Sequence, residues 1–412
     1  MLSYLFREEM GDKPYLQIEV DEHFSKVGVI TRIEAFLNSL SHRETVALDK
    51  NFDLMAVHSR RAYISADPDR EKTVYVPDFG LYTQGICRYL EKAYGVRSIA
   101  MPETDRRQLL TGRAETSAKE YLPFPALLGG VLEQLSTMPP EARKSASFLI
   151  PATEGAEADG QYARVIRSVL DRRGMQDVHI TAPVLEQLPQ RIRQPELLLH
   201  ALVEADLLYL ADPKLREEWK RRDIPEEDAL LTLAETIGRQ PRGGRRLAAV
   251  GDPLCQTTLN EGVLDRLERE GNHILRAPVS EALLFQWQEE AAVSSGCGDF
   301  LGKQTALLRK LADILSENGS FSRDLKALRA TADRKLPRIA GGNIRYRFAK
   351  AAEMGENCAA VLSVAPRYEN AAMVMEMRGL RNEVKAPLTQ LYFDGDWDES
   401  AWARLRSFLY YC

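Results

Sequence analysis

The sequence predicts an α/β fold made of two doubly wound, Rossmann- or flavodoxin-like parallel-sheet lobes with helical insertions. Short runs rich in β-branched and aromatic residues alternate with helical runs along most of the 412 residues. Strands separated by helices of this length imply right-handed βαβ units, and therefore parallel sheets. A chain of this length is also too large for one ordinary hydrophobic core, so we expect at least two domains.

We assign residues 1–195 to the first α/β lobe. Its expected strands span residues 15–20, 73–76, 97–101, 147–151 and 177–182, and its expected helices span 28–40, 81–94, 117–135 and 161–173. The alternation stops after residue 195. We expect a helical connector over 196–243, with helices within 197–220 and 226–237 and with Pro213 and Pro225 as interruptions.

The βα alternation resumes after the segment QPRGGRR at 240–246, which has the composition of a boundary. We therefore assign residues 244–412 to a second α/β lobe. Its expected strands span 247–250, 273–277, 359–364 and 388–393, and its expected helices span 261–270, 345–353, 370–378 and 399–410. A helical insertion is expected at about 281–336.

Charge and composition exclude several classes of partner. The 55 Lys and Arg residues and 60 Asp and Glu residues give a net charge of −5, so no overall field attracts the chain to nucleic acid or to an anionic membrane. No apolar run approaches the roughly 18 residues of a membrane span. The five cysteines are scattered and form no Cys-x-x-Cys pair. We therefore expect a cytoplasmic protein with no nucleic-acid or membrane partner.

Polar and glycine-rich segments follow most of the expected strands. They lie at residues 21–23, 77–80, 151–155, 251–253, 365–369 and 394–396. Ligands of open α/β sheets bind beyond the carboxyl ends of the strands. These segments therefore predict where a binding cleft lies, although they leave the ligand open.

Several blocks, which follow one another in a fixed order, carry a resemblance to a known family. They are residues 19–23 (EVDEH) with 28–37 (GVITRIEAFL), 116–123 (TSAKEYLP), 160–162 (GQY), 246–278, 391–395 (LYFDG) and 404–410 (RLRSFLY). Together they resemble the C-terminal part of the CoA-activase-associated proteins, which are relatives of the 2-hydroxyacyl-CoA dehydratase subunits. The nucleotide-binding activase domain of that family has no counterpart here.

The resemblance implies that an iron–sulfur site has been lost. The cysteines that hold the family's cluster fall on Tyr121, Glu157 and Glu369, and none of the chain's own cysteines occupies a matched position. We therefore expect no iron–sulfur cluster and no other cofactor, and we assign no catalytic or metal-ligating residue. Oxygen donors at the three positions would suit Mg²⁺ or Mn²⁺ better than a cluster.

Matches to the family's motifs also indicate candidate ligand-binding residues. These candidates are Arg32, Ser117, Lys119, Glu120, Gln161 and Tyr162. Donors of this kind at helix starts could receive an anionic group of a CoA thioester. We further expect the loops of the three former cluster positions to converge at the cleft between the lobes, with Arg367 neutralising the carboxylates.

Three functions remain open at this point. The first is a binding or assembly partner of an activase or dehydratase-like subunit. The second is an enzyme that acts on a CoA thioester or another anionic ligand, with a divalent metal or with no metal. The third is a paralogue whose cleft has no function.

Overall fold

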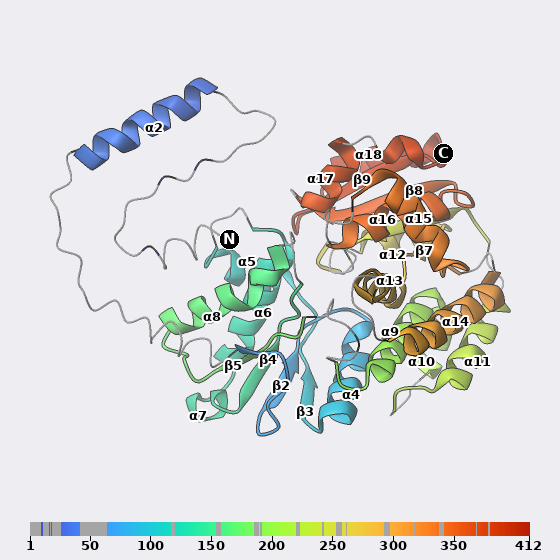
Figure 1. Ribbon diagram of the computed structural model, residues 1–412, viewed down its shortest axis with the longest axis horizontal. Helices are drawn as coiled ribbons and strands as arrows, with labels where there is room; N and C mark the ends of the chain where they lie inside the picture. Colours follow the sequence, from blue (N-terminus) through green and yellow to red (C-terminus); the bar gives the residue numbers. More distant parts are fainter. Residues whose placement is uncertain are drawn as a thin grey trace. The chain divides into compact units, whose positions relative to one another are not determined.

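The computed structural model confirms the α/β fold with two parallel sheets (Figure 1). It describes residues 10, 16, 18, 26–41, 64–116, 120–153, 158–184, 189, 192–219, 223–240, 243–252, 258–260, 262–291, 297–316, 319–337, 342–367, 369–377 and 380–412. The chain divides into two compact units, residues 1–63 and 64–412, and both sheets lie in the second unit. The domain boundaries predicted at 195/196 and 243/244 stay predictions.

The first unit contributes one described helix, α2 (Lys26–Ser41), where the sequence predicts a helix over 28–40. Its apolar residues Ile30, Ile33 and Leu37 follow helical spacing and are exposed. The strand expected at 15–20 and the EVDEH block at 19–23 lie almost entirely outside the described residues.

The first sheet of the second unit has five parallel strands in the order β1-β5-β4-β2-β3. They are β1 (Ile64–Ser65), β2 (Thr73–Val76), β3 (Arg97–Ala100), β4 (Ala146–Leu149) and β5 (His179–Thr181). The helices between them are α4 (Tyr82–Tyr94), α5 (Arg106–Arg113), α6 (Pro123–Ser136), α7 (Pro140–Arg143) and α8 (Tyr162–Arg172). Every residue of β4 and β5 is buried, as expected for parallel strands covered on both faces.

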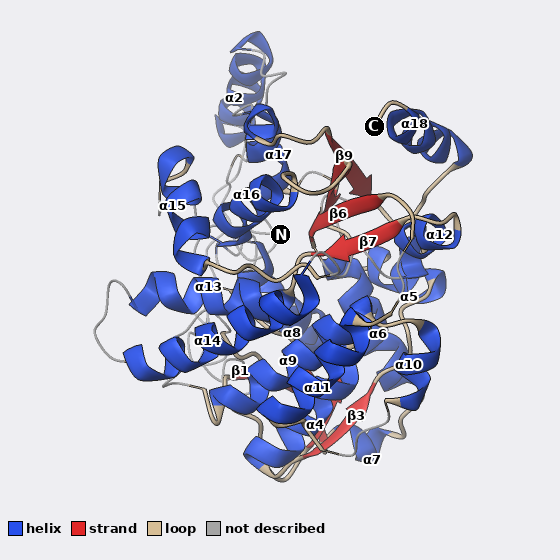
Figure 2. Cartoon of the chain, turned by 90° about the vertical axis from the view of Figure 1, so that its right-hand side faces the viewer, coloured by secondary structure: helices blue, strands red, loops and turns tan. Residues whose placement is uncertain are grey.

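The second sheet has four parallel strands in the order β7-β6-β8-β9. They are β6 (Arg246–Gly251), β7 (His273–Arg276), β8 (Ala360–Pro366) and β9 (Leu388–Phe393). Helices α12 (Val263–Arg269), α16 (Gly342–Met354), α17 (Asn370–Met377) and α18 (Glu399–Tyr410) accompany these strands (Figure 2). Each strand lies within two residues of its sequence-predicted bounds.

Helices also occupy the connector and the insertion of the second lobe. The connector contains α9 (Pro195–Leu210), α10 (Pro213–Glu218) and α11 (Glu227–Gly238), and the insertion contains α13 (Val279–Ala291), α14 (Gly298–Leu315) and α15 (Leu325–Lys335). The helical region expected over 197–220 is interrupted before Pro213, and Asp212 caps the new helix by accepting a hydrogen bond from the Leu215 N–H at 2.8 Å.

Three described strands or α-helices were missing from the sequence prediction, namely β1, α5 and the four-residue helix α7. Strand β1 has only two residues, too few to show a pattern. Helix α5 is strongly polar, but it begins with a capping box in which Asp105 accepts from the Gln108 backbone and the Gln108 side chain accepts from the Asp105 backbone. The helix expected over 117–135 begins at Pro123 in the described residues, because Pro is favourable in a first helical turn.

The buried carboxylate of Asp206, on α9, connects three segments of the chain. Its Oδ1 accepts a hydrogen bond from the Tyr82 hydroxyl at 2.7 Å and another from the Val279 N–H at 2.9 Å. Its Oδ2 accepts from the Ser280 N–H at 3.0 Å. Tyr82 belongs to α4 of the first lobe, whereas Val279 and Ser280 begin α13 of the second. The carboxylate therefore caps α13 and fastens both lobes to the connector.

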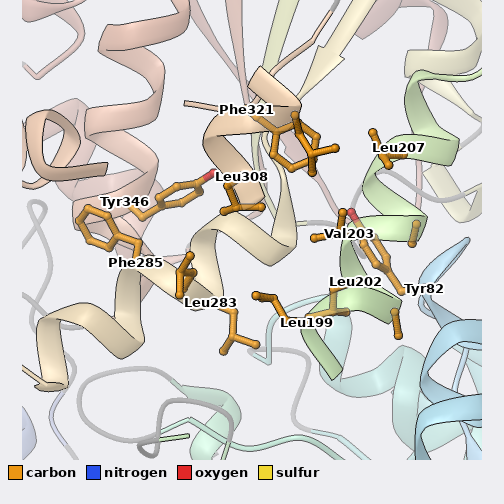
Figure 3. Close-up of a cluster of buried hydrophobic side chains, with 14 of the residues drawn as sticks. Tyr82, Leu199, Leu202, Val203, Leu207, Leu283, Phe285, Leu308, Phe321 and Tyr346 are labelled. Atoms are coloured by element: carbon orange, nitrogen blue, oxygen red, sulfur yellow. The ribbon is translucent and has the colours of Figure 1, made fainter. Parts of the chain in front are cut away.

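Apolar packing surrounds this connection. Figure 3 shows Tyr82 beside the α9 residues Leu202 and Val203, and Leu283 of α13 lies on the opposite side of the same cluster. All of these side chains are less than a tenth exposed. The cluster contains buried residues of both lobes and of the connector, so the two lobes share this core.

Burial raises the pKa of both Asp206 and Tyr82. It raises the pKa of Asp206 from 3.8 to about 6, although the hydrogen bonds from Ser280 and Tyr82 act in the opposite direction. Burial also raises the pKa of Tyr82, and the negative charge of Asp206 raises it further. The tyrosine hydroxyl therefore remains the donor and the carboxylate the acceptor.

The raised pKa of Asp206 predicts a pH-dependent stability. The folded state binds the proton of the Asp206 carboxyl group more tightly than the unfolded state does. The contribution of this group to the unfolding free energy is therefore complete below about pH 4 and is lost as the pH rises through about 6. A shift of this size corresponds to about 3 kcal/mol of unfolding free energy. We expect Asp206→Asn to remove this component, as measured by urea unfolding at a series of pH values.

Asp398→Asn provides a control of opposite sign. Asp398 caps α18, and the hydrogen bond from the Ala401 N–H lowers its pKa, so its contribution is lost as the pH falls. If the wild-type protein and Asp206→Asn show parallel stability curves between about pH 4 and pH 7, the assignment to Asp206 is wrong.

Candidate functional site

A cavity of about 370 Å³ lies where the carboxyl ends of the two sheets meet. The first sheet contributes the strand-end residues Phe79, Pro151, Thr153, Pro183 and Val184. The second sheet contributes Gly251, Asp252, Ala277, Pro366 and Glu369. Four of the predicted strand-end segments therefore converge on one cleft, which confirms that part of the sequence analysis. The segment at 394–396 instead contacts α5, where Arg113 donates to Asp394 Oδ1 at 2.8 Å.

Both sheets place a topological switch point at this cavity. In the first sheet the chain passes from β2 to its neighbour β3, and then crosses to β4 on the other side of β2. The second sheet repeats this route, from β6 to β7 and then to β8 on the other side of β6. The loops that follow such a pair of strands diverge and leave a crevice between them. Here two crevices face each other.

Two glycines allow close backbone contacts beside the cavity. Gly251 ends β6 with φ of +135°, and a Cβ there would lie 1.8 Å from the Val364 carbonyl oxygen. A Cβ on Gly160 would lie 2.4 Å from the Thr153 carbonyl oxygen. No larger residue fits either position without moving the backbone, so these glycines fix the shape of the two strand-end loops.

The walls of the cavity are mainly apolar and are rich in aromatic rings. The aromatic side chains among its described residues are Phe79, Tyr82, Tyr89, Tyr94, Tyr121, Tyr162 and Tyr346. Burial raises the pKa of Tyr82, Tyr162 and Tyr346, so these phenols stay neutral. The Tyr346 hydroxyl donates toward the Glu281 carboxylate at 3.0 Å and lies 3.1 Å from the Pro278 carbonyl oxygen.

A buried ion pair forms part of the wall. The Arg347 guanidinium, on α16, donates to both carboxylate oxygens of Glu369, with its Nη2 at 3.0 Å from Oε1. The two side chains are 2% and 11% exposed, so the pair is shielded from water. The sequence analysis assigned the neutralising role to Arg367, and this was wrong. Arg367 is exposed, whereas α16 brings Arg347 to Glu369 from the inside.

A second acidic group lies on the other side of the cavity. Asp159, in the 3-10 turn Ala158–Gln161, accepts a hydrogen bond from the Thr153 hydroxyl and another from the Gly160 N–H. Burial raises the pKa of Asp159, and the negative charge of Glu369 raises it further. An aspartic acid in this state can exchange a proton closer to neutral pH than an exposed one can.

Two of the three positions that the sequence resemblance assigns to cluster ligands line this cavity. Tyr121, just before α6, and Glu369, after β8, both line it, and both add to the raised pKa of Tyr162. The sequence analysis predicted that the loops of all three positions converge, and the two described positions line this one cavity. Glu157 lies outside the described residues.

Of the six candidate ligand-binding residues, Tyr162 is the one found among the described residues of the cavity wall. Tyr162, the first residue of α8, lines the cavity. Gln161 precedes it, and Glu120 is partly buried beside Tyr121. Arg32 lies on α2, in the other unit, and Ser117 and Lys119 are outside the described residues.

Sequence reasoning missed Arg347 and Asp159. Arg347 follows Arg345 and Tyr346 in a helix whose pattern gives no sign of which basic residue faces inward. Asp159 adjoins the GQY block, and the glycine at its start was the one available signal. The fold brings both residues to one cavity, although they lie far apart in the sequence.

The cysteines lie elsewhere. Cys87 is buried, while Cys297, Cys358 and Cys412 are partly buried. None of these four lines the cavity, and Cys255 is outside the described residues. Among the residues that the structure describes, no three His, Cys, Asp or Glu side chains form a group that could hold a metal ion.

Comparison with protein-family models and with curated proteins finds no match to this chain. Of the helices in the described ranges, none has both the length and the apolar character needed to cross a bilayer. The structure is that of an α/β protein with two parallel sheets and a cavity where the carboxyl ends of the sheets meet.

The ion pair in the cavity wall predicts a large stability effect. Glu369→Ala leaves the buried Arg347 charge without its carboxylate, and we expect the unfolding free energy to fall by about 3–5 kcal/mol. Glu383→Ala is the matched control, because Glu383 and Lys335 form a 2.8 Å ion pair that is almost half exposed and should contribute at most about 1 kcal/mol. Equal effects of the two substitutions in urea unfolding would contradict the buried pair.

Proposed function

We propose that this chain is a dehydratase-like protein without an iron–sulfur cluster of its own. It holds the acyl end of a CoA thioester between its lobes and acts as a binding or assembly partner in an acyl-CoA dehydratase-type system. The observation that carries the proposal is the position of Tyr121 and Glu369. The two residues at matched cluster-ligand positions line one cavity at the switch points of two sheets.

The size of the cavity supports a small ligand group. Ligand pockets commonly enclose roughly 300–1,000 Å³, and this cavity of about 370 Å³ is near the lower end of that range. Its walls are mainly apolar, which suits an acyl chain. The phosphate-bearing part of CoA would remain outside the cavity. The activase or dehydratase-like partner rests on the sequence resemblance.

A second candidate function is catalysis on the bound acyl group without a metal. It is favoured by Asp159, because an acid with a raised pKa beside a mainly apolar cavity can donate or accept a proton. Thr153 fixes this carboxyl group through its hydroxyl, and therefore orients it. The first proposal requires only binding, whereas this one adds a proton transfer.

The loss of thiolates predicts a protein without cluster absorbance. A phenol and carboxylates are poor ligands for iron–sulfur clusters. We expect anaerobically purified and reconstituted protein to be colourless, with iron and acid-labile sulfide far below one cluster per chain. Stoichiometric iron and sulfide would refute this expectation and would direct attention to Cys255, Cys297 and Cys358.

Binding of a thioester in the cavity can be tested by thermal unfolding. Butyryl-CoA should raise the melting temperature more than free CoA, because a ligand that binds the folded state stabilises it. Ala282→Phe places a ring in the cavity wall and should abolish the difference. Ala403→Phe, at an exposed position of α18, is the matched control and should preserve it. The same response to butyryl-CoA and CoA in every variant would exclude the acyl group from the cavity.

A further inference from the structure

Several polar side chains of the cavity wall already bond to other groups of the protein. The hydroxyls of Tyr82, Tyr89 and Thr153 all donate to protein acceptors. The Glu369 carboxylate accepts from Arg347. A wall group that is paired in this way must give up its protein partner in order to bind a ligand. A ligand therefore gains most from wall groups that have no protein partner.

Helix α13 presents such a group on the face that it turns toward the cavity. Val279, Ala282, Leu283 and Gln286 all line the cavity, and their positions i, i+3, i+4 and i+7 place them on one side of the helix. The first three side chains are apolar, whereas Gln286 carries a half-buried amide. Among the residues that the structure describes, no group forms a hydrogen bond with this amide.

The hydroxyl of Tyr162 is a second group of this kind. Tyr162 begins α8 and is 4% exposed, and its ring packs against Phe124 with 5.1 Å between the ring centroids. Over the described part of the chain its hydroxyl has no hydrogen-bond partner, and the oxygen is accessible rather than fully enclosed. Because the rest of this residue is buried and the residue lines the cavity, the hydroxyl opens on the cavity.

Both groups are attached to backbone that is held in place. Asp206 caps α13 through the first N–H groups of that helix, and Trp287, the neighbour of Gln286 in the sequence, is fully buried. The turn before α8 is fixed by the close approach of Gly160 to the Thr153 carbonyl oxygen. The two groups come from different lobes, so a ligand that bonds to both is held in one orientation.

These two groups favour a neutral ligand group that accepts hydrogen bonds. The glutamine amide donates through its nitrogen, and the Tyr162 phenol keeps its proton because burial raises its pKa. A carbonyl oxygen has two lone pairs and no net charge. It can therefore accept from both donors, and it enters an apolar cavity at a lower cost than an ion does. The thioester of an acyl-CoA contains such an oxygen.

We propose that Tyr162 and Gln286, one from each lobe, bind the carbonyl oxygen of the acyl group and set its orientation in the cavity. This inference rests on the proposed binding of the acyl end of a CoA thioester, and it specifies which residues recognise that end. Gln286 is then a residue that determines specificity for a thioester.

Two CoA derivatives that differ in the carbonyl group test this inference. Butyryl-CoA is a thioester, and S-butyl-CoA is the thioether with the same carbon chain and no carbonyl oxygen. Binding of each derivative to the full chain is measured by calorimetry. We expect butyryl-CoA to bind at least about tenfold more tightly, because the thioether leaves both donors of the wall without an acceptor.

Conservative substitutions assign the difference to the two residues. Gln286→Met and Tyr162→Phe keep most of the side-chain volume but remove the hydrogen-bonding group. Each should reduce the preference for butyryl-CoA to about threefold or less and leave the affinity for S-butyl-CoA unchanged. Gln84→Met, at an exposed position of α4, and Tyr410→Phe, at an exposed position of α18, are the matched controls and should preserve the preference.

The possible outcomes separate this inference from the proposed function. If the two derivatives bind equally well and Ala282→Phe weakens both, the acyl chain occupies the cavity but the recognition of its carbonyl oxygen is wrong. A preference for butyryl-CoA that persists in both Gln286→Met and Tyr162→Phe also overturns the inference. If neither derivative binds, or if Ala282→Phe changes neither affinity, the proposed binding of an acyl group in the cavity is refuted as well.

Discussion

One buried carboxylate connects both lobes to the connector helix α9. Asp206 receives three hydrogen bonds, one from the first lobe and two from the start of a helix of the second. Tyr82 and Val279, which provide two of them, also line the cavity. This connection between the lobes therefore lies directly beside the cavity. A buried carboxylate is costly in free energy unless its donors are well placed, so this connection tolerates little displacement of either lobe.

The use of one strand order in both lobes explains why a site forms at all. Each switch point alone would produce a shallow crevice at a sheet edge. Because the connector turns the second sheet so that its carboxyl edge faces that of the first, the two crevices close on each other. The side chains of the site then need no common sequence motif. Asp159 and Glu369 act on one another although 210 residues separate them along the chain.

Much of the fold could be predicted from the sequence, because alternating short β-rich and longer helical runs specify parallel βαβ units regardless of detail. The strand-end segments also identified four walls of the cavity in advance. The partner of Glu369 could not be predicted, since Arg367 and Arg347 are equally basic in the sequence and only burial distinguishes them. Helix α5 was missed because its stability depends on the Asp105 cap and on packing rather than on an apolar stripe.

The Arg347–Glu369 pair also constrains how the protein can evolve. Replacing either residue alone leaves a buried charge without its counterpart, whereas replacing both by apolar residues of similar volume can be nearly neutral. The two positions are therefore expected to change together in descendants of this sequence. A cysteine at position 369 would leave the buried Arg347 charge without its carboxylate unless position 347 changes as well. A variant with one substitution is selected against whichever of the two residues changes first, because it holds a buried charge without its counterpart.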